Sequence, residues 1–141
     1  MQTGPILVID DDTEDHDILE QVLLELGHEG ELVFVKTAEE AVMRLRDTHL
    51  APFIILCELN LHGINGFDLR TQLLEVGTKK FKSVPFIFWS THASEAQITR
   101  AYDLSVHGFF IKEGSFNDLK DTFRCIINYW TKSKKPSKTI F

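Results

Sequence analysis

The chain has 141 residues, of which 43% are hydrophobic and 26% charged, a composition typical of one globular domain. No apolar run approaches the ~20 residues of a membrane span, and no basic stretch precedes an apolar one at the N-terminus, so we expect a cytoplasmic protein without a membrane partner. The formal net charge is −6, which argues against nucleic acid as the main partner.

Acidic residues dominate the body of the chain but not its end. Residues 132–141 contain four lysines and no acid, and we interpret them as a basic tail that follows a single domain, residues 1–131. Such a tail is usually solvated, and the alternative is an electrostatic contact with an acidic partner. The two cysteines, Cys57 and Cys125, lie in apolar segments, so we expect buried, reduced thiols.

Strand-like and helix-like segments alternate five times along the sequence. The expected strands are 5–9, 31–35, 53–57, 86–89 and 109–111. The expected helices are 13–26, 38–47, 67–76, 95–104 and 116–130. In the first of these helices, the three- and four-residue spacing predicts a buried face made of Ile18, Val22, Leu23 and Leu26. Gly77 is expected to end the third helix, and 78–83 to form a polar surface linker.

The order of these segments predicts the fold. Five β/α units imply a parallel sheet with helices on both faces, joined by right-handed crossovers. Segment 31–35 alternates as an edge strand does, whereas 5–9, 53–57 and 86–89 have the continuous apolar character of buried strands. We therefore expect an α/β, flavodoxin-like (βα)5 fold with strand order 2-1-3-4-5.

In this order the first and third strands are neighbours, and both end in acids. Asp10 and Asp11 follow the first strand and Glu58 follows the third, at the carboxyl edge where open α/β sheets bind ligands. Carboxylates brought close together need a counter-charge. Mg²⁺ suits this role because it takes a few carboxylates together with water and a carbonyl, here that of Asn60.

The last two strands bring further polar groups to the same edge. Ser90 and Thr91 close the fourth strand, and Lys112 follows the fifth. Acids, a hydroxyl group and a lysine at successive strand ends are typical of a phosphoryl-transfer site. Each residue alone is explained as well by solvation of the sheet edge, but the four positions together favour a site.

Four segments then show a resemblance to a known family. They are residues 6–12, 55–66, 85–91 and 108–112. Together they resemble the receiver domain of bacterial two-component response regulators, from Ile6 to about Trp130. The resemblance implies that Asp10 and Asp11 hold Mg²⁺, that Ser90 binds the phosphoryl group, and that Lys112 is the lysine of the receiver site.

One departure from the family pattern matters most. The phosphoryl-accepting aspartate of receivers ends the third strand, and this chain has Glu58 at that position. The longer side chain adds ~1.5 Å of reach, which misaligns it for in-line attack and carries its carboxylate toward Ser90 and Lys112. Our hypothesis is that Glu58 imitates the phosphorylated state in part, that normal phosphotransfer is lost or very weak, and that the output is constitutive.

Other departures are smaller. Glu113 stands where receivers usually have a proline, and Phe109 stands where they often have a switching tyrosine, so a hydroxyl-dependent switch is absent. His62 replaces a common loop proline, and His92 lies beyond Ser90. We expect both histidines to be exposed loop residues rather than a metal or phosphohistidine site. Trp89 should point away from the site, into the core.

The leading functional hypothesis is a stand-alone receiver module of a phosphorelay, not an enzyme. The resemblance implies that it acts by binding a sensor histidine kinase or another signalling protein through helix 95–104, strand 109–111 and helix 116–130, with a homodimer also considered. A second hypothesis is a hydrolase of the haloacid dehalogenase type, but Thr13 lies one position too early for that motif. A third is a receiver-fold scaffold that uses neither metal nor phosphate.

Overall fold

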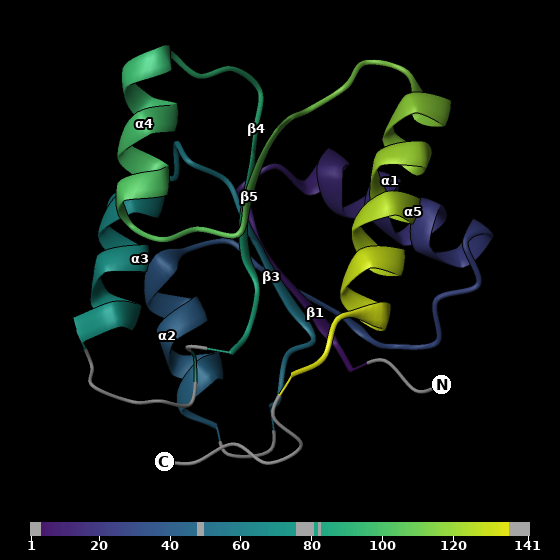
Figure 1. Ribbon diagram of the computed structural model, residues 1–141, viewed down its shortest axis with the longest axis horizontal. Helices are drawn as coiled ribbons and strands as arrows, with labels where there is room; N and C mark the ends of the chain where they lie inside the picture. The colour runs from purple at the N-terminus through teal and green to yellow at the C-terminus, as the bar shows by residue number, and fades with distance from the viewer. Residues whose placement is uncertain (1–3, 48–49, 76–80, 82, 136–141) are drawn as a thin grey trace.

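The computed structural model describes residues 4–47, 50–75, 81 and 83–135. Within them, five strands alternate with five helices (Figure 1). In chain order they are β1 (Ile6–Ile9), α1 (Thr13–Glu25), β2 (Leu32–Val35), α2 (Ala38–Arg46), β3 (Ile54–Cys57), α3 (Gly66–Glu75), β4 (Phe86–Ser90), α4 (Glu95–Asp103), β5 (Gly108–Ile111) and α5 (Phe116–Lys132). The expected alternation of strands and helices is confirmed.

The sheet has the expected order, β2-β1-β3-β4-β5, and all its strand pairs are parallel. Ile9 of β1 is in register with Cys57 of β3. Ser90 of β4 is in register with Ile111 of β5. β1 and β3 therefore end level, as do β4 and β5, while β4 continues past Phe88, the partner of Cys57, to Ser90. The residues at these strand ends gather at one edge.

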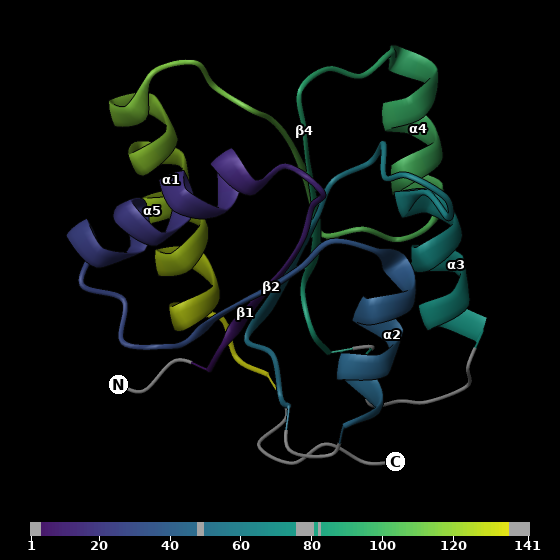
Figure 2. The same ribbon diagram turned by 180° about the vertical axis from the view of Figure 1, so that it is seen from behind.

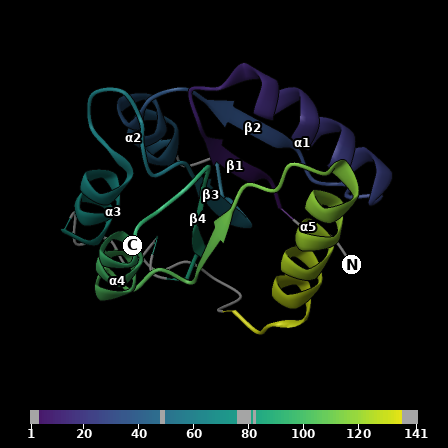
Figure 3. The same cartoon turned by 90° about the horizontal axis from the view of Figure 1, so that it is seen from above.

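Helices cover both faces of the sheet, so the molecule has three layers. α1 and α5 lie on one face, and α2, α3 and α4 lie on the other (Figures 1 and 2). Viewed from above, the two groups of helices flank the sheet (Figure 3). Successive residues of a strand point to opposite faces, so Leu7 and Ile9 pack under α2, whereas Ile6 and Val8 pack in the cluster of α1 and α5.

Two details of burial differ from the sequence prediction. The inner face of α1 is made by Leu19, Val22 and Leu23, whereas Ile18 is 38% exposed. The stripe i, i+3, i+4 thus begins one residue later than predicted. Cys57 is buried as expected, but Cys125 is exposed because it lies on the outer side of α5.

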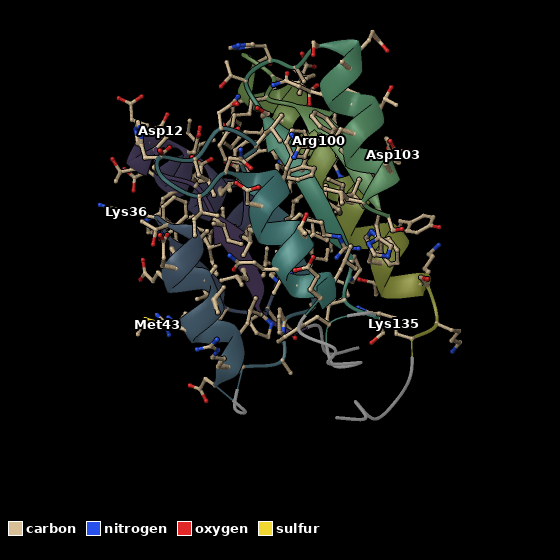
Figure 4. The ribbon with its side chains drawn as sticks, turned by 90° about the vertical axis from the view of Figure 1, so that its left-hand side faces the viewer. Asp12, Lys36, Met43, Arg100, Asp103 and Lys135 are labelled. Carbon is tan, nitrogen blue, oxygen red and sulfur yellow. The ribbon has the colours of Figure 1, made fainter. Side chains whose placement is uncertain are left out.

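The ends of several segments also depart from expectation. Lys135, in the tail predicted to be solvated, donates a hydrogen bond to the carbonyl oxygen of Phe53 at 3.1 Å, at the end of the molecule opposite to Asp12 and Arg100 (Figure 4). Phe81, in the linker predicted to be polar and exposed, is buried. Gly77 and most of that linker lie outside the described residues.

No described helix combines the length and apolar character needed to cross a membrane.

Candidate functional site

The candidate site lies at the carboxyl edge of the sheet, where four strands deliver four polar side chains. Asp10, Glu58 and Lys112 directly follow β1, β3 and β5, and Ser90 is the last residue of β4. Parallel strands place such residues at a common edge. Asp10, Glu58 and Ser90 are all buried, which is unusual for two acids unless they are paired. The edge is therefore a closed polar cluster rather than a solvated rim.

Glu58 is the central acceptor of this cluster. Its Oε2 accepts a hydrogen bond from Ser90 Oγ at 2.6 Å and another from the backbone N–H of Asn60 at 3.1 Å. Its Oε1 accepts from Lys112 Nζ at 2.9 Å. Burial alone would raise the pKa of the Glu58 carboxyl, but the bonds from Ser90 and Lys112 outweigh it and lower the pKa below its usual value. Glu58 is therefore held as a carboxylate whose two oxygens are both engaged.

Lys112 supplies the positive charge at the centre of the cluster. Its ammonium group donates to Asp10 Oδ2 at 2.8 Å, to Asp15 Oδ2 at 2.6 Å and to Glu58 Oε1 at 2.9 Å. It also lies 4.8 Å from the centre of the Trp89 ring. Burial would lower the pKa of Lys112, but the bonds to the carboxylates raise it above its usual value. Lys112 therefore stays protonated.

The two aspartates that follow β1 have different surroundings. Asp10 Oδ1 accepts a hydrogen bond from the backbone N–H of Asp12 at 3.0 Å, and Oδ2 accepts from Lys112. Burial raises the pKa of Asp10 to about 6 in spite of these bonds. Asp11 is more open, with its Oδ2 at 3.3 Å from Nε2 of His62, a side chain that is 94% exposed. Only Asp10 therefore belongs to the buried cluster.

The remaining predicted residues surround the cluster without entering it. Thr91 is exposed, one residue beyond Ser90. Phe109 is half-buried and packs against Phe88, with ring centres 5.6 Å apart. Trp89 is buried as expected and contacts Phe123 edge-on. It does not point away from the whole site, however, because its ring also lies beside the Lys112 ammonium. Phe109 and Trp89 thus pack on opposite faces of the sheet.

Asp15 is the site residue that sequence reasoning missed. It is the third residue of α1 and follows the N-cap residue, Asp12. Its contact with Lys112 joins residues 97 positions apart. A signal was present, because a helix that begins just after β1 starts at the same edge of the sheet as the strand ends. Acids in the first turn of a helix are usually explained by their interaction with the helix dipole. Because that explanation is sufficient for Asp15 in the sequence, its contact with Lys112 is not predicted.

The residues at the edge can be tested for their fit to Mg²⁺. The sequence predicts a site made by Asp10, Asp11, Glu58 and Asn60. In the structure both oxygens of Glu58 and both oxygens of Asp10 accept hydrogen bonds, and Lys112 lies between these carboxylates. This arrangement does not fit a divalent cation, because the ion would need the place and the ligands that Lys112 already has.

Elsewhere in the described part of the chain, one group of side chains brings three metal-type ligand atoms within 4.8 Å of one another, and it consists of His16, Asp17 and Glu20. Asp17 and Glu20 are exposed on α1, whereas His16 is half-buried and stacks on the ring of Phe34. Exposed acidic groups of this kind are common without a metal ion, so we assign them no role.

The fold and this set of strand-end residues define a class of protein, the parallel α/β modules with a charged, hydrogen-bonded site at the carboxyl edge of the sheet. Residues 6–124 match the family model of the response regulator receiver domain. The chain therefore belongs to the receiver domain family. Membership in this family leaves the hydrolase alternative without support.

Known proteins of several kinds are similar to the chain. The probable methanogenesis regulatory protein FilR2 of Methanothrix harundinacea is 26% identical over 129 residues, which cover 89% of this chain and 82% of that protein. The chemotaxis protein CheY1 of Helicobacter pylori is 24% identical over 122 residues, covering 86% of this chain and 95% of CheY1.

Solved structures share the fold. The phosphorylated cyanobacterial phytochrome response regulator RcpA superposes with a TM-score of 0.84 at 24% identity, covering 96% of this chain and 99% of RcpA. The Mn²⁺-bound form of the response regulator Rcp1 superposes with a TM-score of 0.81 at 22% identity, covering 94% of this chain and 99% of Rcp1. These structural similarities show the fold. The chemistry of the site is inferred from the residues of this chain.

Proposed function

We propose that this chain is a receiver module in which Glu58 takes the part of a phosphorylated aspartate, and that it signals by binding another protein. Phosphotransfer to its own site is lost or very weak in this proposal. In this proposal the module acts in the cytoplasm, without enzymatic activity. The observation that carries the proposal is the pair of hydrogen bonds from Ser90 and Lys112 to the Glu58 carboxylate.

The direction of the Glu58 side chain supports this proposal. In the family that the chain resembles, the residues equivalent to Ser90 and Lys112 bind the phosphoryl group. Here the same two side chains bind the two oxygens of Glu58, at 2.6 and 2.9 Å. A negative group thus reaches the hydroxyl and the ammonium without any phosphodonor.

The saturation of Lys112 supports the loss of phosphotransfer. An ammonium group has three N–H donors, and three carboxylates accept bonds from this one. A phosphoryl group entering the site would have to displace one of them. Glu58 is also a poor nucleophile here because its two oxygens are already hydrogen-bonded and its charge is stabilised by Lys112.

A path from Glu58 to α4 exists in the described contacts. α3 begins at Gly66, whose backbone N–H donates to the Leu59 carbonyl at 2.9 Å in the segment just after Glu58. The guanidinium of Arg100 on α4 lies over the ring of Phe67 on α3, 4.3 Å from its centre. The position of Glu58 is thereby linked through the start of α3 to α4.

A second contact fixes the C-terminal end of α4, close to Arg100. Arg70 of α3 is buried and donates to the carbonyl oxygens of Leu104 at 3.0 Å and Ser105 at 2.8 Å. Side-chain donors at a helix C-terminus satisfy its last carbonyl groups. α3 therefore holds the C-terminal half of α4 through two contacts, which supports a single orientation of α4 in this module.

The surface that we assign to the partner is the one formed by α4, β5 and α5. Each of these elements exposes a large apolar or aromatic side chain, namely Tyr102 (52%), Ile111 (43%) and Tyr129 (64%). Aromatic residues of this kind are enriched in protein interfaces. The partner is a sensor histidine kinase, another signalling protein, or a second copy of the chain.

The test is intact-mass analysis after incubation with Mg²⁺ and a small phosphodonor, with the native chain compared with Glu58→Asp. We expect Glu58→Asp to gain one phosphoryl group and the native chain to gain none. Phosphorylation of the native chain at Glu58, located by peptide mapping, would contradict the proposal. If neither form reacts, the result favours the alternative of a scaffold that uses neither metal nor phosphate.

A further inference from the structure

In the cluster at the sheet edge, each hydrogen-bond donor of the Lys112 ammonium is matched by one carboxylate acceptor. Lys112 has three N–H donors, and each of them meets a carboxylate oxygen of a different residue, at 2.8, 2.6 and 2.9 Å. The Lys112 side chain is 12% exposed, and its partners Asp10, Asp15 and Glu58 are 1%, 14% and 8% exposed. The cation is thus enclosed by its own ligands, with Trp89 on a further side.

Asp15 is the partner that the ordinary receiver site does not explain. A carboxylate in the first turn of a helix stabilises the helix dipole without any partner, and Glu14 beside it has that simple role. Asp15 instead lies mostly out of solvent and forms the shortest of the three contacts with Lys112. Its carboxylate supplies the third acceptor of the buried ammonium, and also a negative charge that an amide in its place would not supply.

We propose that the Lys112 ammonium is the permanent cation of this edge, and that Asp15 anchors it there together with Asp10 and Glu58, in place of a divalent metal ion. Asp15 is in this sense a positioning residue, since it acts on the site through Lys112. The site keeps its arrangement without Mg²⁺. The inference rests on the proposed function, because it explains how the site holds one state without phosphate, but its test uses no phosphodonor.

The first test is a double-mutant cycle of urea-unfolding stability. Asp15→Asn should destabilise the native chain, because it weakens the hold on Lys112. The same substitution should stabilise Lys112→Met, because the remaining acids then repel one another without a cation. Destabilisation by Asp15→Asn in both backgrounds would show an acid that serves only the helix dipole, and would overturn the proposal. The control is Asp17→Asn, which removes an exposed acid of the same helix. Its effect on the free energy of unfolding should have the same sign in the native and Lys112→Met backgrounds.

The second test measures the melting temperature against Mg²⁺ concentration, and it remains decisive if Lys112→Met folds poorly. A ligand that binds the folded state raises the melting temperature with the logarithm of its concentration. We expect the native chain to show no such rise, and Lys112→Met to show it. Lys120→Met, which removes a lysine paired with Glu25 on the surface, should behave as the native chain does. A rise in the native chain equal to that of Lys112→Met would overturn the proposal.

The two proposals fail in distinguishable ways. Phosphorylation of the native chain at Glu58 would remove the proposed function but leave the sign of the Asp15 cycle untouched. A native chain that is stabilised by Mg²⁺ would remove the inference on Lys112, while the absence of phosphorylation would still hold.

Discussion

Removal of the Ser90 hydroxyl group is the most informative single change at the site. Ser90→Ala deletes the 2.6 Å bond to Glu58 Oε2 in a fully buried position and leaves the rest of the cluster in place. A hydrogen bond to a charged group contributes about 1.5–3 kcal/mol, and we expect the free energy of unfolding to fall by that amount at pH 7. Thr91→Ala changes the next residue, which is exposed, and should cost less than about 0.5 kcal/mol.

The effect of Ser90→Ala should depend on pH. The folded pKa of Glu58 is lowered from 4.5, so its charged form contributes stability above the unfolded pKa, and that contribution is lost as the pH falls through the folded pKa. The bond from Ser90 is part of this lowering. The gap in unfolding free energy between the native chain and Ser90→Ala should therefore shrink as urea unfolding is repeated from pH 7 down through the titration of Glu58. A gap that is no larger than that of Thr91→Ala, or that is constant with pH, would refute the assigned role of the bond.

Two further predictions concern the surroundings of the site. A Cβ at Gly66 would lie 2.8 Å from the carbonyl oxygen of Glu58, so Gly66→Ala should lower the free energy of unfolding by about 1–3 kcal/mol in urea. Gly114→Ala is the control, because a Cβ there meets nothing within 4 Å. An equal loss of unfolding free energy in the two variants would count against close packing at Gly66. Burial, together with the charge of Arg70, lowers the pKa of His107 below its usual value of 6.5. The neutral form of His107 therefore contributes to the stability of the fold above pH 6.5. This contribution is lost as the pH falls from 6.5 toward the lower pKa of the folded state. The native chain should therefore lose its advantage over His107→Asn in thermal melts between pH 7.5 and pH 5, and a constant advantage would be the contrary result.

The sequence predicted the strand order and most of the site because both depend on local patterns. Apolar runs that end in polar residues identify the strands and their carboxyl ends, and the right-handed crossover rule then leaves few topologies. Asp10, Glu58, Ser90 and Lys112 could be brought together on that basis alone. The direction of the Glu58 carboxylate toward Ser90 also followed from the length of its side chain.

The features that were missed depend on packing over long distances. Asp15 meets Lys112 only because the first turn of α1 lies beside the end of β5, which local patterns do not reveal. Arg70 is buried because it finds the carbonyl oxygens of Leu104 and Ser105, whereas an arginine in a helix is usually exposed. The exposure of Cys125 reflects the rotation of α5 about its own axis, which the apolar neighbours of this residue in the sequence do not fix.

In the function proposed above, Glu58 holds the module in a state like that of a phosphorylated receiver. The most direct measurement compares amide NMR spectra of the native chain with those of Glu58→Asp before and after phosphorylation. We expect the native resonances of α4, β5 and α5 to lie with or close to those of phosphorylated Glu58→Asp. Native resonances that coincide with those of the unphosphorylated variant would contradict the claim.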